Sequence, residues 1–185
     1  SLKHFAVNNQ ETLRMSVSAE VDERALHELY LRPFEIAVKE GAPSTVMCSY
    51  NRINGVYASE NRMLLTRILR EQWGFDGLVM SDWGAVYRRP AGVAAGLDLE
   101  MPSSGGVTDR EIVRAVRAGR LDEAALDALC ARVLRLALAH APQRKKAYPA
   151  PVHNVAAVRR MLDRHHALAV RAARESAVLL KNEGR

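Results

Sequence analysis

A single aspartate at the end of an apolar run is the residue best suited to chemistry in this chain of 185 residues. The segment "GLVMSDWGAV", residues 77–86, places Asp82 where a buried strand would stop, and Trp83 and a glycine follow it. A carboxylate at such a position either caps a turn or lies at the mouth of a site and reacts. Taken alone, the segment is equally compatible with both interpretations.

Other polar side chains follow the remaining apolar runs. In parallel sheets, functional side chains gather where strands end and loops begin. The expected strand ends supply cations, hydroxyls, carboxylates and an aromatic ring: Lys3, His4, Ser49, Tyr50, Asn51, Asp82, Trp83 and Glu100. Such a set suits a polyhydroxylated ligand, because hydrogen-bonding groups would hold the hydroxyls while Trp83 covers the apolar face of a sugar ring.

Four strand-then-helix units would position these residues. The expected strands are residues 2–7, 44–50, 77–82 and 97–101, and the expected helices are residues 18–41, 61–73, 91–96, 108–119 and 122–141. Alternating strands and helices imply parallel pairing with right-handed crossovers. Four such units make half of a (β/α)8 barrel, so the sequence predicts an α/β fold of the partial TIM type.

The first of these helices carries specific start and break signals. Its apolar residues recur near helical spacing and predict a buried face: Leu26, Tyr30, Phe34 and Val38. We expect Ser18 or Asp22 to cap its beginning. Pro33 should kink it, because the proline ring removes one hydrogen-bond donor and clashes with the preceding turn.

The remainder of the chain reads as a connection. We expect residues 1–141 to form the second half of a barrel, and residues 142–185 to contain a linker, "PQRKKAYPAP", a helix over residues 155–175 and the start of a strand, "SAVLLKN". A half barrel would have two open sheet edges. The chain is therefore expected to be a fragment, with further barrel strands on its N-terminal side.

The composition is that of an ordinary globular chain, 48% hydrophobic and 26% charged with a net charge of +6. The arginines are scattered among acids on the expected helices, which indicates a solvated surface and not a nucleic-acid-binding face. No apolar run approaches the roughly 20 residues that cross a membrane. The two cysteines, Cys48 and Cys130, lie far apart without metal-binding spacing, and we expect both to be buried free thiols.

Five long stretches occur in one order along the chain: "KHFAVNNQE", "VMCSYNRINGVYASEN", "LLTRILREQWGFDGLVMSDWGAV", "GLDLEMP" and "ESAVLLKNEG". The first four resemble the N-terminal barrel of glycoside hydrolase family 3, in its β-glucosidase-like branch. The last is similar to the passage from that barrel into the family's second domain. The resemblance implies a retaining β-glycosidase that removes β-linked glucose from the non-reducing end without a metal or an organic cofactor.

The resemblance also implies a role for individual residues. Asp82, in "SDW", corresponds to the catalytic nucleophile, and Lys3 and His4 correspond to a pair that binds sugar hydroxyls. Arg14 would contact the sugar ring or support the site. The remaining counterparts line the sugar subsite: Met47, Tyr50 and Trp83.

The chemistry of a retaining glycosidase agrees with this assignment of Asp82. Such an enzyme needs two carboxyl groups about 5–5.5 Å apart, one to attack the anomeric carbon and one to protonate the departing oxygen. Cations near Asp82, such as Lys3, Arg14 or protonated His4, would favour its ionised form. We do not expect Glu100 to be the second carboxyl group, because "LDLEMP" resembles barrel structure and the family takes its acid/base glutamate from the second domain. Asp98 is also expected to be structural.

The Lys3–His4 pair poses a geometric problem. Consecutive residues of a strand point to opposite faces, so both side chains reach one sugar only from a distorted strand end. A cis peptide bond without proline is one such distortion, and these bonds occur mainly at functional sites. We therefore expect a distorted backbone at Lys3–His4.

Two departures from the family bear on the substrate. Tyr87 and the run 88–90, Arg-Arg-Pro, stand where relatives commonly carry smaller polar residues. The branch that acts on N-acetylglucosamine typically has "KHFPGHG" and a loop His-Asp pair, neither of which occurs here. The alternatives are a β-xylosidase or arabinosidase of the same family, or a basic binding module that has lost its chemistry.

Overall fold

The computed structural model describes residues 1–147 and 155–181. The chain divides into two units, Ser1–His140 and Ala141–Arg185, and every strand found among the described residues lies in the first. The assignment of residues 1–141 to half a barrel and of residues 142–185 to a connection remains a prediction.

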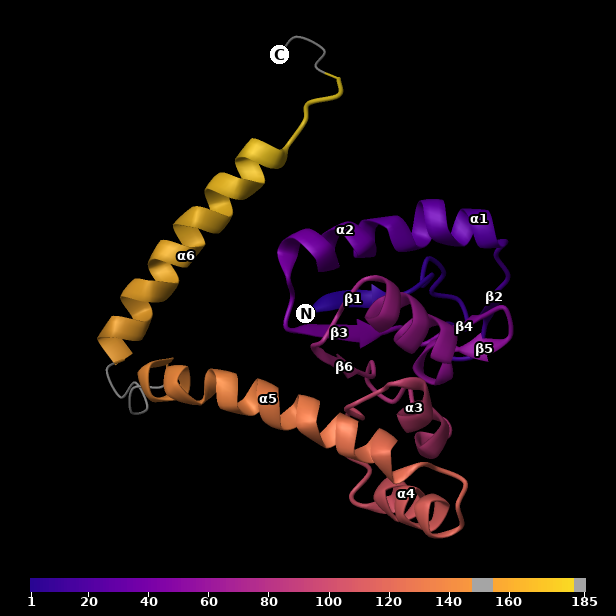
Figure 1. The fold of residues 1–185 in the computed structure, drawn as a ribbon. Helices are drawn as coiled ribbons and strands as arrows, with labels where there is room; N and C mark the ends of the chain where they lie inside the picture. Colours follow the sequence, from indigo (N-terminus) through magenta and orange to yellow (C-terminus); the bar gives the residue numbers. More distant parts are fainter. Residues whose placement is uncertain (148–154, 182–185) are drawn as a thin grey trace. The chain divides into compact units, whose positions relative to one another are not determined.

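A parallel three-stranded sheet forms the centre of the first unit. It contains β1 (Leu2–Phe5), β3 (Thr45–Cys48) and β6 (Leu78–Met80) in the order β1-β3-β6. Figure 1 shows helix α2 (Arg32–Gly41) running alongside β1 and β3. The predicted α/β class, with a parallel sheet covered by helices, is confirmed.

The two faces of this sheet have different environments, because successive strand side chains point to opposite sides. On one face, Val46 and Cys48 are completely buried against the helices. On the other face, Thr45 and Met47 are only partly buried. The core on the helix-covered side includes large apolar side chains from strands and helices: Phe5, Leu26, Leu31, Leu64, Leu65, Ile68, Leu69 and Val79.

The helix after β1 changes its hydrogen-bond pattern along its length. It consists of α1 (Glu23–Ala25), the π-helix η1 (Leu26–Leu31) and α2 (Arg32–Gly41). Of the two predicted caps, Asp22 is the one used, and its side chain accepts the Ala25 N–H at 2.9 Å. The wide π turns end just before Pro33, whose missing N–H interrupts the α-helical pattern.

The later helices follow the predicted order. The π-helix η3 (Met63–Gln72) connects β3 to β6, and the Asn61 side chain accepts the Leu64 N–H at its start, at 3.0 Å. It is followed by α3 (Arg89–Ala95), α4 (Val107–Arg117) and α5 (Glu123–Ala147). The predicted linker was therefore placed too early, because α5 continues past Pro142 through residues with good helix propensity to Ala147; residues 148–151 of that linker lie outside the described residues.

A second small sheet was not predicted. It contains β2 (Ser18–Ala19), β4 (Arg52–Ile53) and β5 (Val56–Tyr57), followed by the 3-10 helix η2 (Ala58–Glu60). Strands β4 and β5 form an antiparallel hairpin whose turn, Asn54-Gly55, has positive φ at both residues. Strand β2 lies at the start of the expected helix over residues 18–41, and β4 and β5 lie between the expected strand 44–50 and the expected helix 61–73.

The fourth predicted strand is largely absent. Of residues 97–101, only Leu99 forms a parallel bridge, to Met80. In the second unit, the predicted helix is confirmed as α6 (Val155–Ser176). The strand predicted after it is wrong over residues 177–181, which have no regular structure, and residue 182 lies outside the described residues. No helix in the described part of the chain is long and apolar enough to span a bilayer.

A buried carboxylate fixes the end of this sheet. Asp98 is inaccessible to solvent, and its oxygens accept hydrogen bonds from Arg70 Nη2 at 2.8 Å and Arg132 Nε at 2.7 Å. The same carboxylate accepts the backbone N–H of Val79, in β6, at 2.8 Å. Asp98 therefore joins β6 to η3 and α5, which agrees with the structural role expected for it.

Replacement of Asp98 should strongly destabilise the fold. Asp98→Asn would leave Arg70 and Arg132 partly buried without a counter-charge, and such a loss costs about 3 kcal/mol or more of unfolding free energy. Urea denaturation measures this change. Asp76→Asn is the matched control, because Asp76 is 90% exposed and lies 4.0 Å from Arg135. Equal midpoints for the two variants would contradict the structural role of Asp98.

Candidate active site

Asp82 lies just beyond the carboxyl end of β6 and is directed toward the end of β1. Its Oδ2 lies 3.3 Å from His4 Nε2, while Oδ1 accepts the Trp83 backbone N–H at 2.6 Å. The side chain of Asp82 is 14% exposed and that of His4 is 33% exposed. Asp82 therefore caps the turn that follows β6 with one oxygen and presents the other at the sheet edge, beside the imidazole.

The backbone of β1 is distorted where the sequence analysis expected it. The Lys3–His4 peptide bond is cis, and so is the Phe5–Ala6 bond. His4 reaches Asp82, whereas Lys3 is exposed and makes no contact with Asp82 within the described residues. Convergence of both side chains on one sugar remains a prediction.

Tyr50 and Trp83 are linked beside this carboxylate. The Tyr50 hydroxyl donates a hydrogen bond to the Trp83 carbonyl at 3.0 Å. Burial, followed by hydrogen bonding to Asp82 and its negative charge, raises the pKa of Tyr50, so the hydroxyl keeps its proton near neutral pH. The Trp83 side chain is largely exposed, with 59% of the residue accessible. Its ring is therefore available as an apolar surface.

Arg14 approaches the site through Tyr50. The guanidinium carbon of Arg14 lies 4.7 Å from the centroid of the Tyr50 ring, within the range of a cation–π contact. Its Nη1 also pairs with Glu11 Oε2 at 2.8 Å. Five of the seven predicted site residues are thus connected by contacts, from His4 through Asp82 and Trp83 to Tyr50 and Arg14.

Met47 occupies the partly buried face of the sheet. It is in register with Met80, two residues before Asp82 in β6. Side chains two residues apart in a strand share a face, so Met80 and Asp82 point to the same side of the sheet. Met47, which is paired with Met80, points to that side as well. Met47 is therefore on the correct side of the sheet to line a site at the carboxyl ends of its strands.

The other carboxylates that follow β6 are already engaged. Glu100 accepts the Thr108 hydroxyl at 2.5 Å and lies 3.8 Å from the Nε of the buried Arg89. Asp98 is enclosed by its two arginines. Neither of them is placed as a free partner for Asp82, which agrees with the expectation that Glu100 is not the acid/base.

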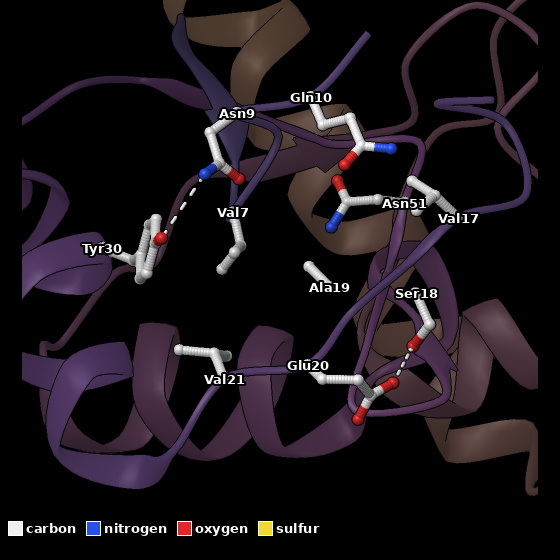
Figure 2. A pocket seen from close by; sticks show the side chains of 10 residues that line it. All are labelled: Val7, Asn9, Gln10, Val17, Ser18, Ala19, Glu20, Val21, Tyr30 and Asn51. Atoms are coloured by element: carbon white, nitrogen blue, oxygen red, sulfur yellow. Dashed lines mark hydrogen bonds between the residues drawn. The ribbon is translucent and has the colours of Figure 1, made fainter. Parts of the chain in front are cut away.

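A separate polar cavity, shown in Figure 2, is lined by residues between Val7 and Val21 together with Tyr30 and Asn51. It has a volume of about 330 Å³, and of the predicted site residues only Asn51 lines it. Asn9 donates to the Tyr30 hydroxyl at 3.4 Å, and Ser18 donates to Glu20 at 2.5 Å. The buried Oδ1 of Asn51 has no hydrogen-bond partner there. This cavity was not predicted from the sequence, because its lining residues come from three separate segments of the chain.

Metal-binding and thiol chemistry have little support in the described residues. No group of three or more His, Cys, Asp or Glu side chains is placed there to hold a metal ion. Burial raises the pKa of the Cys48 thiol to about 12. Cys130 is free but exposed on α5, so the prediction that both thiols are buried is wrong for Cys130.

Known proteins resemble both this sequence and this structure. The family profile described as "Glycosyl hydrolase family 3 N terminal domain" matches residues 1–136. Thermostable beta-glucosidase B of Acetivibrio thermocellus is 50% identical over 182 residues, which are 98% of this chain and 23% of that protein. An exo-alpha-(1->6)-L-arabinopyranosidase of Bifidobacterium longum is 49% identical over 183 residues, 99% of this chain and 23% of that protein.

A solved structure supports the same relationship. The crystal structure of a Bifidobacterium adolescentis GH3 beta-glucosidase superposes with a TM-score of 0.82 at 48% identity, covering 98% of this chain and 25% of that one. A beta-glucosidase 3B from Thermotoga neapolitana in complex with alpha-D-glucose gives a TM-score of 0.71 at 45% identity, covering 74% of this chain and 20% of that one. The chain spans about a quarter or less of the length of these relatives.

The two cysteines should differ sharply in reactivity. With a pKa of about 12, Cys48 would be thiolate in only about one molecule in ten thousand at pH 8, and the folded chain shields it. Iodoacetamide at pH 8 should therefore modify Cys130 and spare Cys48, as peptide mass spectrometry would show. Both should react after denaturation in urea, and equally rapid labelling of both thiols in the folded protein would contradict the burial of Cys48.

Proposed function

The chain belongs to glycosyl hydrolase family 3, and we propose that it supplies the nucleophile of a retaining β-glycosidase of the β-glucosidase type. The observation that carries this proposal is the position of Asp82, an accessible carboxylate at the end of a parallel sheet, 3.3 Å from His4. A carboxylate that served only as a turn cap would need just the Trp83 N–H. The second oxygen, directed at the sheet edge, is the one available for attack.

The proposed reaction has two steps. In the first, an Asp82 oxygen forms a bond to the anomeric carbon of a β-glucoside as the bond from that carbon to the leaving oxygen breaks, and a second carboxyl group donates a proton to the leaving oxygen. In the second, water attacks the anomeric carbon and displaces Asp82, while the same second group takes a proton from the water. The sugar leaves with its original anomeric configuration.

The neighbours of Asp82 would bind the sugar. His4 and Lys3 would hold sugar hydroxyls, and the guanidinium of Arg14 would contact the ring substituents from its position over Tyr50. The protonated Tyr50 hydroxyl fixes the Trp83 backbone, and Met47 and the Trp83 ring would contact apolar parts of the sugar. None of these roles requires a metal or an organic cofactor.

We further propose that this chain is one part of a larger catalytic unit. Residues 1–141 would form the second half of a (β/α)8 barrel, and residues 142–185 would lead to a second domain that brings the acid/base glutamate. The short coverage of its relatives supports this proposal, as does the engagement of Glu100 and Asp98 elsewhere. The 185 residues alone would then be inactive, or nearly so.

Covalent trapping tests the role of Asp82 in the full-length enzyme. A 2-deoxy-2-fluoro-β-glucoside with a good leaving group should add one fluoroglucosyl mass to the peptide that contains Asp82. Asp82→Asn should abolish the adduct and lower kcat by at least about a thousandfold, because the nucleophile is lost. An adduct elsewhere would overturn the assignment of Asp82, and no adduct with any fluorosugar would favour a binding module that has lost its chemistry.

A pentoside substrate is the second candidate, favoured by the 49% identity to an arabinopyranosidase. Measuring kcat/KM for nitrophenyl β-D-glucoside, β-D-xyloside and α-L-arabinopyranoside separates the candidates. As a control common to all three substrates, hydrolysis should be lost in Asp82→Asn. We expect kcat/KM to be at least about tenfold higher for the glucoside, since a site built for a hydroxymethyl group loses its contacts with a pentose. The reverse order would assign the enzyme to pentosides.

A further inference from the structure

The loop after the proposed nucleophile, residues 83–88, is attached to the loop that carries Arg14, residues 12–16. We call the second of these the Arg14 loop. The Tyr87 ring stacks on Tyr57, with ring centroids 3.7 Å apart and an interplanar angle of 16°. The Tyr87 hydroxyl donates a hydrogen bond to the Met15 carbonyl. Residues separated by 72 positions are thus connected directly.

Arg52 makes a second attachment to the same loop. Its guanidinium carbon lies 5.0 Å from the centroid of the Tyr57 ring, and its Nη2 donates to the Ser16 carbonyl at 2.9 Å. Two successive carbonyls of the Arg14 loop are therefore each held by one member of this group. We call Arg52, Tyr57 and Tyr87 the aromatic clamp.

Contacts at the site complete a closed circuit. Arg14 lies over the Tyr50 ring, and the Tyr50 hydroxyl donates to the Trp83 carbonyl. Trp83 lies only four residues before Tyr87, in the same loop. The Arg14 loop therefore meets the nucleophile loop twice, once through Tyr50 at the site and once through the clamp.

The Arg14 loop is also held at its C-terminal end, where the Val17 carbonyl accepts the Arg52 backbone N–H at 2.9 Å and β2 pairs with β4. Its apolar side chains are largely exposed, with Leu13 73% exposed and Met15 42% exposed, so packing against the core does little to fix Arg14. Its internal hydrogen bonds are local, such as Ser16 N to the Leu13 carbonyl at 2.8 Å. The position of Arg14 over Tyr50 thus depends on attachments from outside the loop.

The Tyr87 end of the clamp is, by contrast, firmly anchored. The next residue, Arg88, donates its backbone N–H and its Nε to the Glu60 carboxylate at 2.8 and 2.9 Å, and the Glu60 side chain is only 3% exposed. Burial also raises the pKa of Tyr87 to about 12. Its hydroxyl therefore remains a donor over the whole range in which a glycosidase works.

We propose that Tyr87 is a positioning residue that holds Arg14 over Tyr50 and so determines how tightly the site binds the sugar. This inference rests on the proposed function, in which Arg14 contacts the sugar. Tyr87 acts through the Arg14 loop, without touching the substrate. The departure from smaller polar residues at this position thus has a specific consequence for sugar affinity.

Tyr87→Phe in the full-length enzyme tests this inference, because it keeps the stacked ring and removes only the donor to Met15. We expect KM for nitrophenyl β-glucoside and the inhibition constant of glucose to rise together by about fivefold. The value of kcat should stay within twofold, because the same binding free energy is lost in the substrate complex and in the transition state. Tyr30→Phe, which removes a hydroxyl from a tyrosine outside the clamp, is the matched control. An unchanged KM in Tyr87→Phe, or an equal rise in Tyr30→Phe, would overturn the proposal.

A double-mutant cycle shows whether Tyr87 acts through Arg14. In an Arg14→Ala background, Tyr87→Phe should cause no further rise in KM, whereas independent effects would multiply and contradict the proposal. Asp82→Asn, assayed alongside, distinguishes failure of the proposed function from failure of the positioning role of Tyr87. Full activity of Asp82→Asn overturns the proposed function itself, while an inactive Asp82→Asn together with independent Arg14 and Tyr87 effects overturns only the positioning role.

Discussion

The approach of His4 Nε2 to within 3.3 Å of Asp82 Oδ2 is the interaction on which the candidate site depends. It joins the end of β1 to the end of β6 across the intervening strand β3. Only parallel pairing brings both carboxyl ends to the same sheet edge, and a slip of one residue in β6 would turn Asp82 to the helix-covered side. The register of this sheet is therefore the first requirement for the proposed chemistry.

Two kinds of support keep that register and its rim in place. Below the edge, the buried Asp98 carboxylate ties β6 to Arg70 and Arg132. At the rim, aromatic rings and guanidinium groups connect the loops, with Tyr50 joined to Trp83 and Tyr87 joined to Met15. The scaffold is held by buried charge and apolar packing, whereas the loops that would meet a sugar are held by exposed polar contacts.

The sequence predicted well those features that depend on local pattern. Apolar runs bounded by polar residues located β1, β3 and β6. Asp82 and His4 could be chosen as site residues because the carboxyl ends of parallel strands lie on the same side of a sheet. The hairpin β4–β5 was missed because two-residue strands carry too few residues to show alternation. The Tyr57–Tyr87 stack joins residues 30 positions apart, a contact that no spacing rule reveals. The placement of Arg14 over Tyr50, away from Asp82, likewise depends on the fold of its loop.

The most direct measurement is the distance from Asp82 to the anomeric carbon of a bound sugar, in a crystal structure of the full-length enzyme with glucose. The account predicts that an Asp82 carboxylate oxygen lies about 3–3.5 Å from that carbon, the separation expected for an attacking group, with His4 hydrogen-bonded to the sugar. Glucose bound away from the edge shared by β1 and β6, or an Asp82 carboxylate directed away from it, would contradict the account.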